Sequence, residues 1–304
     1  MSESRFRTLG GHLATAGAYT IFGLNIVFCK DIANSGLVSP VVLFTFRVGG
    51  AALLFWLLSL FLPPEPVRKG DFGPIALASF IGLFVPQLTF LMAMPLASPI
   101  DTAVMSTLGP IFTMFFALFF LGEPVTGQKA GGVALSFAGV LFLIFNSVHT
   151  GGVGHSTPGG IFFLLLNCLS FSLYLGAFRP LIGRYGVVTF MKWMFLFSFL
   201  LSLPVSARVL LQTPFSALSP QLCWEIGYMV VFATFISYFL IPVGQKILRP
   251  TLVSMYSYVQ PVIAAVVGIR AGMDSLSWQK AVATVLIVTG VLLVSRSRGR
   301  KEKS

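Results

Sequence analysis

The stretch LGPIFTMFFALFFLGEP, residues Leu108–Pro124, is a long apolar run that opens on Gly-Pro and closes on Gly-Glu-Pro. A second stretch, VQPVIAAVVGIRAGMD at residues 259–274, repeats this layout, with a proline near the start, an apolar run and a turn that ends in an acid. Pro110 and Pro261 are 151 residues apart, and the same register holds without a gap over residues 99–141. A proline pair, a Gln-Lys pair and a Gly-Val-Leu tripeptide all coincide in that register. The coincidence indicates an internal duplication.

The composition is that of a membrane protein. The 304 residues are 56% hydrophobic, include 31 Phe and only 10% charged residues, and have a mean hydropathy of +0.91. A helix needs about 20 apolar residues to cross the hydrocarbon core, and backbone groups in lipid must be hydrogen-bonded within the segment. We therefore expect an all-α membrane protein with ten transmembrane helices. The predicted spans are residues 9–29, 38–62, 74–96, 99–121, 128–146, 159–181, 186–206, 222–245, 250–270 and 277–295.

The repeat divides the predicted spans into two sets of five. Residues 1–146 form the first five-helix repeat, residues 147–158 an outside linker, and residues 159–304 the second five-helix repeat with a basic cytoplasmic tail. Because five is odd, the second repeat enters the membrane from the opposite side, and the two repeats are inverted. Inverted repeats are typical of secondary transporters, which bind substrate at mid-depth between the halves and rock to alternate access.

The formal net charge of +11 reflects topology. With the amino terminus in the cytoplasm, fourteen Lys and Arg residues fall in inside segments and four fall outside. This distribution follows the positive-inside rule. It predicts a multi-pass protein of the bacterial inner (plasma) membrane with both termini cytoplasmic, and no nucleic-acid partner.

Several motifs resemble those of a known family. The block LGPIFTMFFALFFLGEPVTGQKAGGVALSFAGVLFL, the segment FGLNIVFCK at Phe22–Lys30 and the second-span Arg47 are similar to the drug/metabolite transporter superfamily, EamA type. Within it the chain looks most like the bacterial amino-acid exporters of the YddG type. The resemblance implies a cavity lined by spans 1, 3, 4, 6, 8 and 9, with the others outside. The second half departs from the signature at residues 271–274, where Gly-Glu-Pro is lost.

Polar side chains inside a bilayer are costly and tend to face the bundle interior or a water-filled cavity. Gln87 and Met94 share one face of the third span, and the residues 151 further on, Tyr238 and Gln245, form a matching stripe in the eighth. The alternative is that such groups only hydrogen-bond one helix to another. The predicted substrate-binding residues are Asn25, Gln87, Phe90, Met94, Thr107, Asn167, Ser170, Tyr174, Tyr238, Gln245 and Tyr258.

This set indicates a small amphiphilic substrate. Amides and hydroxyls hold a zwitterion without opposite formal charge, and aromatic and Met side chains offer an adaptable apolar wall. No Lys or Arg falls on the predicted lining faces, so a sugar phosphate is poorly served. Arg47 is the exception to weigh: its long side chain can snorkel to the outer interface or face the substrate, and we favour the structural role. We expect Lys192 to snorkel inward in the same way. With the resemblance, these features favour export of aromatic or large neutral amino acids; another metabolite or drug class is the alternative.

No enzyme constellation is present in the sequence. It lacks a nucleotide-binding glycine loop and a Ser or Cys paired with His, so we expect no catalytic residue and no cofactor. His149 and His155 lie too far apart in the linker to predict a metal site. A membrane-embedded enzyme and a channel are the rival classes. We expect a transporter that functions as a monomer and, because no Asp or Glu is predicted at mid-membrane, lacks an acidic proton relay.

The two duplicated prolines suggest a hinge in each half. Proline lacks the backbone N–H and clashes with the carbonyl four residues earlier. Pro110 and Pro261 are therefore expected to kink their spans near the start. Breaks at matching positions of two halves are a good sequence indicator of a transporter's site.

Overall fold

The computed structural model describes residues 2–97, 102, 105–148, 157–260, 262–263 and 278–297. Within these ranges every regular element is a helix, which confirms the all-α prediction. Pro261, His149 and His155 lie outside the described residues, as does most of the linker at 147–158.

The first repeat contains two long helices, a composite span and a pair of helices joined by a tight turn. In order these are α1 (Ser2–Ser35), α2 (Pro40–Ser59), the 3₁₀ turn η1 (Lys69–Asp71), α3 (Phe72–Ser79), the π-helix η2 (Phe80–Phe84), α4 (Val85–Ala93), α6 (Gly109–Leu121) and α7 (Gly127–Val148). Segments α3, η2 and α4 follow one another without a break and form one span. Gly122 ends α6 with φ 61°, a left-handed conformation that glycine adopts without strain.

The second repeat follows the same order. Its elements are α8 (Pro158–Ala177), α9 (Arg179–Arg184), α10 (Val187–Gln212), the 3₁₀ turn η3 (Phe215–Ala217), α11 (Pro220–Val230), the π-helix η4 (Val231–Ile236), α12 (Ser237–Ile247), α13 (Pro250–Met255), the 3₁₀ turn η5 (Tyr256–Tyr258) and α15 (Trp278–Arg296). The two π-helices begin 151 residues apart, at Phe80 and Val231. The duplication is therefore visible down to a local irregularity of the third and eighth spans.

Three helices begin on a Ser-Pro or Thr-Pro pair. Ser39, Thr157 and Ser219 each accept a hydrogen bond from the backbone N–H three residues later, at 3.3, 3.1 and 3.2 Å. The proline that follows occupies the first helical turn, where its missing N–H is not needed. These pairs set the start of α2, α8 and α11.

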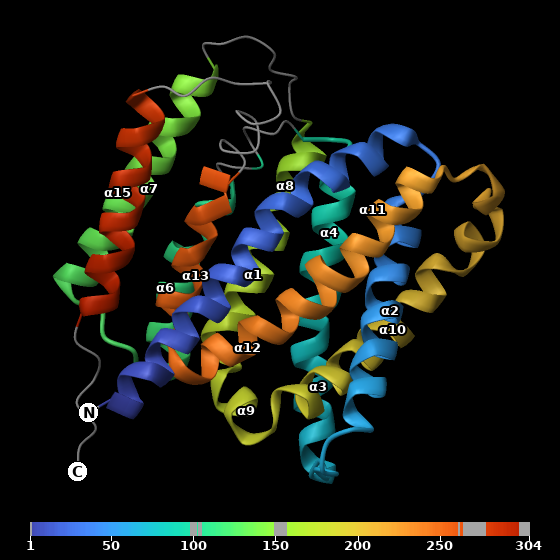
Figure 1. Cartoon of the computed structure of the whole chain (residues 1–304), viewed down its shortest axis with the longest axis horizontal. Helices are drawn as coiled ribbons and strands as arrows, with labels where there is room; N and C mark the ends of the chain where they lie inside the picture. The colour runs from blue at the N-terminus through green and yellow to red at the C-terminus, as the bar shows by residue number, and fades with distance from the viewer. Residues whose placement is uncertain are drawn as a thin grey trace.

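Equivalent helices of the two repeats run in opposite directions. In Figure 1, α2 descends while α10 rises, and α7 rises while α15 descends. Two helices pack against their own counterparts, α2 on α10 and α7 on α15. The packing of α1 against α12 is repeated by that of α8 against α4. The pattern is that of two inverted repeats related by a pseudo-twofold axis.

Two contacts join residues that are themselves equivalent. The Ser136 hydroxyl donates to the Ile287 carbonyl at 3.1 Å, and the Tyr258 hydroxyl donates to the Thr107 carbonyl at 3.1 Å. Both pairs are 151 residues apart. A contact between equivalent positions lies on or near the pseudo-twofold axis, so the first places the axis through the α7–α15 pair.

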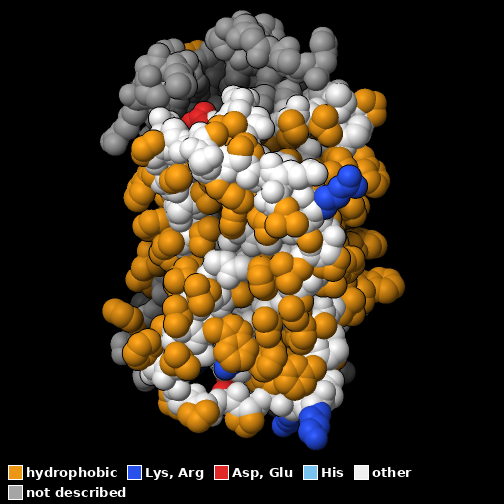
Figure 2. Space-filling view, turned by 90° about the vertical axis from the view of Figure 1, so that its right-hand side faces the viewer, with side chains coloured by type: hydrophobic (Ala, Val, Ile, Leu, Met, Phe, Trp, Pro, Cys, Tyr) orange, Lys and Arg blue, Asp and Glu red, His pale blue; other side chains and the backbone are white. Residues whose placement is uncertain are grey.

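Six described helical segments are long and apolar enough to cross a membrane. They are Phe6–Ser35, Pro40–Ser59, Lys69–Ala93, Pro158–Ala177, Val187–Gln212 and Pro220–Ile247, with shorter apolar helices at Gly109–Leu121 and Val285–Val294. Figure 2 shows one face covered by hydrophobic side chains over most of its height, with Lys and Arg towards its ends. The protein is a multi-pass membrane protein.

Spans 4 and 9 differ from the uninterrupted helices predicted over 99–121 and 250–270. Span 4 is helical at Met105 and Ser106, turns at Thr107 and Leu108 and resumes as α6 at Gly109, and span 9 tightens into the 3₁₀ turn η5. Pro110 occupies the first turn of α6, directly after this break in the span, and its role as a hinge stays a prediction. The chain is thus interrupted at equivalent positions of both repeats.

A buried ionic cluster connects the repeats at the end where α1 begins. The Glu123 carboxylate, in the α6–α7 turn, lies 2.9 Å from the fully buried Lys129 ammonium and 3.8 Å from Arg249 Nε of the second repeat. The Thr251 hydroxyl, at the start of α13, donates to the same carboxylate at 3.3 Å. The turn of the first repeat is thereby tied to the second.

Two further acids of the first repeat bind the second repeat at this end. Arg184 Nη1 lies 3.0 Å from Asp71, and the Tyr185 hydroxyl donates to Asp71 at 2.5 Å, a hydrogen bond that raises the pKa of Tyr185. The Glu65 carboxylate accepts the Gly186 N–H at 3.0 and 2.8 Å, just before α10 begins. The carboxylate favours that position because it faces the positive end of the helix dipole.

Candidate functional site

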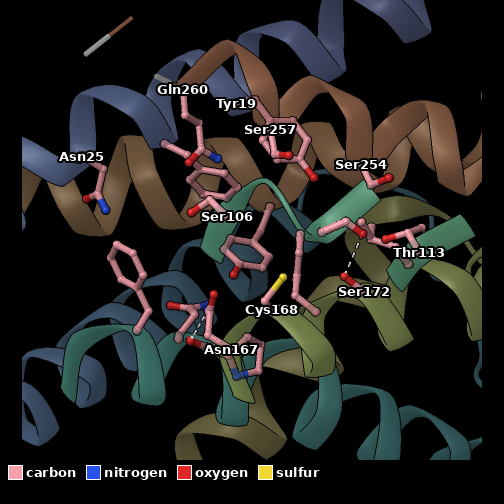
Figure 3. A pocket seen from close by; sticks show the side chains of 18 of the residues that line it. Tyr19, Asn25, Ser106, Thr113, Asn167, Cys168, Ser172, Ser254, Ser257 and Gln260 are labelled. Atoms are coloured by element: carbon pink, nitrogen blue, oxygen red, sulfur yellow. Dashed lines mark hydrogen bonds between the residues drawn. The ribbon is translucent and has the colours of Figure 1, made fainter. Parts of the chain in front are cut away.

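A cavity lies between the two repeats, close to the helix interruptions. The cavity and its opening to solvent together hold about 820 Å³ of empty space. Its walls come from α1, α4, α6, α8, α12 and α13, with the residues around the two interruptions and one residue of α2 (Figure 3). The lining residues are Tyr19, Phe22, Asn25, Ile26, Arg47, Pro86, Gln87, Phe90, Ser106, Gly109, Thr113, Asn167, Cys168, Phe171, Ser172, Leu175, Tyr238, Ser254, Ser257 and Gln260. Apart from Arg47, the spans are those that the family resemblance implies.

Aromatic rings form much of the apolar wall. Tyr238 of α12 makes edge contacts with Phe22 of α1 and Phe171 of α8, at ring-centroid distances of 5.6 and 6.4 Å. Phe22 also meets Tyr19 edge-on at 5.8 Å. Edge-to-face pairs of this kind hold rings in fixed orientations. The wall therefore offers a preformed surface for an apolar or aromatic group.

Five of the eleven predicted binding residues line the cavity: Asn25, Gln87, Phe90, Asn167 and Tyr238. The Asn167 amide donates to the Pro86 carbonyl at 2.7 Å, which satisfies a carbonyl in the third span. The Asn25 amide donates to the Cys29 sulfur at 3.3 Å. These contacts orient both amides at the cavity wall.

Six predicted residues lie elsewhere. Met94 lines a second cavity beside Cys29 and Gly36, and Ser170 donates to the Ile81 carbonyl at 2.6 Å. Tyr258 donates to the Thr107 carbonyl, so both serve the packing of spans 4 and 9. Tyr174 and Gln245 are buried away from the cavity.

Several cavity side chains have polar atoms without a partner among the described residues. Oδ1 of Asn25 and the hydroxyls of Thr113 and Ser257 are buried and make no hydrogen bond there, and the Gln87 amide has no partner beyond the neighbouring Tyr238 hydroxyl. Buried polar atoms are normally paired. A ligand or water in the cavity would satisfy these donors and acceptors.

The eleven predicted binding residues do not include four cavity residues next to the helix interruptions. Ser106 and Ser257 are equivalent in the 151-residue register, as are Gly109 and Gln260, and all four line the cavity. The signal that could have found them is the register itself, since it places a polar or small residue one to four positions before both duplicated prolines.

Arg47 is the main correction to the sequence analysis. It is 3% exposed and faces the cavity, whereas we expected it to reach the outer interface. Its Nε–H donates to the Thr234 hydroxyl in η4 at 2.9 Å, so α2 contributes to the site through a single cation. The Lys192 ammonium lies over the Trp56 ring at 4.8 Å from the centroid.

Among the described residues, no group of three or more His, Cys, Asp or Glu is placed to hold a metal ion. The cavity chemistry there rests on amides, hydroxyls, aromatic rings and one guanidinium.

Comparison with known proteins gives the family. The EamA-like transporter family matches the chain twice, over residues 9–145 and 158–296. The chain belongs to this family. Two matches of nearly equal length support the duplicated architecture, and members are transporters and not enzymes.

EamA-like relatives cover most of the chain. An uncharacterized transporter, YcxC, of Bacillus subtilis is 24% identical over 90% of this chain and 88% of its own length. An uncharacterized inner membrane transporter, YedA, of Escherichia coli is 26% identical over 82% of this chain and 79% of its own. A protein of known crystal structure shares the fold with a TM-score of 0.73 at 22% identity, over 96% of both chains. The function established by these matches is membrane transport of a small molecule.

Proposed function

We propose that the protein exports aromatic or large neutral amino acids from the cytoplasm by alternating access. The observation that carries the proposal is the cavity between inverted repeats, which joins an aromatic wall to amide and hydroxyl groups without partners among the described residues. Such a wall suits varied apolar side chains. The polar groups suit the carboxylate and ammonium that all amino acids share. A YddG-type activity is the form of this proposal that the sequence favours.

The inverted repeats supply the mechanism. Exchanging the conformations of the two halves would open one end of the cavity as the other closes. The ionic clusters at Glu123 and Asp71 hold the halves together at the end where α1 begins. The positive-inside rule places that end, and both termini, in the cytoplasm. This arrangement therefore corresponds to a state closed to the cytoplasm. We take one chain as the functional unit.

Efflux from liposomes tests the proposal. Purified protein reconstituted with internal radiolabelled L-phenylalanine should release it with saturable kinetics, and external unlabelled phenylalanine should accelerate exchange. Empty liposomes are the control. A panel of leucine, a cationic dye and a sugar phosphate separates the alternatives: flux of only the dye or the sugar phosphate would assign the protein to another metabolite or drug class.

The same preparation addresses the two rival classes. Non-saturable flux without counterflow would indicate a channel. Conversion of a substrate without movement across the bilayer would indicate a membrane-embedded enzyme.

A further inference from the structure

Arg47 is a buried cation that faces the cavity. It lies in the middle of α2, and its side chain is almost fully removed from solvent. Bringing a charged side chain out of water costs several kcal/mol unless a counter-charge or several hydrogen bonds compensate. We therefore expect the Arg47 guanidinium to have partners that compensate for its burial.

One partner holds the guanidinium from the side of the eighth span. The Nε–H donates to the Thr234 hydroxyl, and that hydroxyl itself donates to the Met229 carbonyl at 2.7 Å, five residues earlier. The wider turn of the π-helix η4 brings this carbonyl within reach of the hydroxyl, whose proton is thereby committed and whose lone pair faces Arg47. Thr234 thus fixes one edge of the guanidinium.

The remaining N–H groups have no acceptor in the described part of the chain. A guanidinium carries five N–H donors, and the hydrogen bond to Thr234 uses one of them. The titratable groups that interact electrostatically with Arg47 are Cys29 and Tyr238, both neutral near pH 7. A fork of donors at a cavity wall, held along one edge, matches the geometry of a carboxylate.

No described acid neutralises Arg47. Glu123 and Asp71 are engaged at the end where α1 begins, Glu65 accepts from Gly186, and Glu225 accepts from Gln221 at 3.0 Å. Asp31, near the end of α1, is exposed, and none of these acids lines the cavity. Asp101 and Asp274 lie outside the described residues.

We propose that Arg47 binds the carboxylate of the transported molecule, which makes the cavity selective for ligands with one carboxylate on an apolar or aromatic body. This inference deepens the proposed function and rests on it for the identity of the substrate. A single cation serves one carboxylate, whereas a phosphate dianion calls for several. A ligand with only a positive charge is repelled. The acceptor oxygens of Asn25 and Gln87 complete the site by receiving an ammonium.

Three probes with the same phenyl ring test the charge preference on the wild-type protein. They are 3-phenylpropionate, which has only the carboxylate, phenethylamine, which has only the ammonium, and L-phenylalanine, which has both. Titration calorimetry of the protein in lipid nanodiscs gives each Kd. We expect phenylpropionate to bind at least about tenfold more tightly than phenethylamine, as befits a charge-assisted hydrogen bond. Equal or reversed affinities would overturn the proposal without any variant.

Variants then assign the preference to Arg47. Arg47→Gln should weaken phenylpropionate and phenylalanine about tenfold to a hundredfold and leave phenethylamine unchanged or improved. Arg47→Lys keeps the charge and should retain part of the affinity. Lys192→Gln, which removes a cation that lies over Trp56 and does not line the cavity, is the matched control and should bind as wild type. Should Arg47→Gln fail to fold, the ratio of the wild-type Kd values for phenylpropionate and phenethylamine, together with the Arg47→Lys variant, tests the proposal.

The outcomes separate this proposal from the proposed function. Binding of phenylpropionate that depends on Arg47, in a protein that moves no amino acid in liposomes, would refute the function and keep the site. Phenylalanine efflux with unchanged KM in Arg47→Gln would refute the site and keep the function. If chloride protects the wild type against heat as well as phenylpropionate does, the site holds an inorganic anion and the substrate assignment is wrong.

Discussion

Removing the charge of Glu123 should destabilise the protein more than removing the charge of its partner Lys129. Lys129 is fully buried, and its ammonium has its ion pair with Glu123 at 2.9 Å. In Glu123→Gln this ammonium keeps no anion, and breaking a buried pair in this way costs about 3–5 kcal/mol. At about 2–4 °C per kcal/mol the apparent Tm should fall by roughly 6–20 °C. In Lys129→Met the carboxylate keeps Arg249 and Thr251, so the loss should be smaller.

Intrinsic tryptophan fluorescence during heating in nanodiscs measures the three variants together. The double variant Glu123→Gln, Lys129→Met removes both charges, and because replacing a buried pair by uncharged groups is often nearly neutral, it should recover most of the Tm lost by Glu123→Gln. If Glu123→Gln lies within about 2 °C of wild type, or if the double variant is the least stable of the three, the carboxylate does not carry the free energy assigned to it here.

The remaining predictions concern transport in liposomes. Gln87→Ala should raise the KM for phenylalanine efflux, since losing a buried hydrogen-bonding group costs about 1–3 kcal/mol, whereas Ser170→Ala, whose hydroxyl bonds the Ile81 carbonyl, should keep the wild-type KM; equal KM values in both would return Gln87 to helix packing. Efflux should proceed with no imposed pH gradient, because none of the described cavity-lining residues is acidic, and gradient-driven accumulation abolished by an uncoupler would contradict this. Pro110→Ala should lower turnover more than affinity if the interruption before α6 is a hinge; unchanged turnover in a folded variant would remove that role.

The helices and their inverted arrangement could be predicted from the sequence through the 151-residue register of the duplication. Its prolines and apolar runs specify helices and their inversion, because span length and hydrophobicity follow directly from composition. The same register predicted Gln87 and Tyr238 on facing walls, and both line the cavity. Gln245 shares a face with Tyr238 but lies two turns away, about 10 Å along the helix. The sequence therefore predicts which face of a helix points to the other repeat. The depth of the cavity along that face depends on tertiary packing.

The position of Arg47 at the cavity could not be predicted from the sequence, because the family resemblance implies that span 2 lies outside the cavity. Close packing of α2 against its neighbours allows the Arg47 side chain to reach the cavity. A methyl group at Gly49 would lie 2.8 Å from the Phe199 ring, and one at Gly50 would lie 2.5 Å from the Val230 side chain. These two glycines let α2 approach α10 and the eighth span, so that the Arg47 side chain reaches Thr234. The sequence Arg-Val-Gly-Gly indicates this close packing only when the helices that contact the two glycines are known.

The contacts between equivalent residues differ from the ionic contact in how they respond when the two repeats exchange conformations. The exchange carries each equivalent pair onto itself, so Ser136 stays beside Ile287 and Tyr258 stays beside Thr107. The donor and acceptor positions are exchanged, however, and Ile287 has no side-chain donor, so the packing of the pair is common to both forms whereas the Ser136 hydrogen bond belongs to this one. The ionic contact of Glu123 with Arg249 joins residues that are not equivalents, so the exchange does not carry it onto itself. Substitutions that disturb the packing of the equivalent pairs should therefore change the stability of the protein, and substitutions at the ionic contact should also change which side of the membrane it faces.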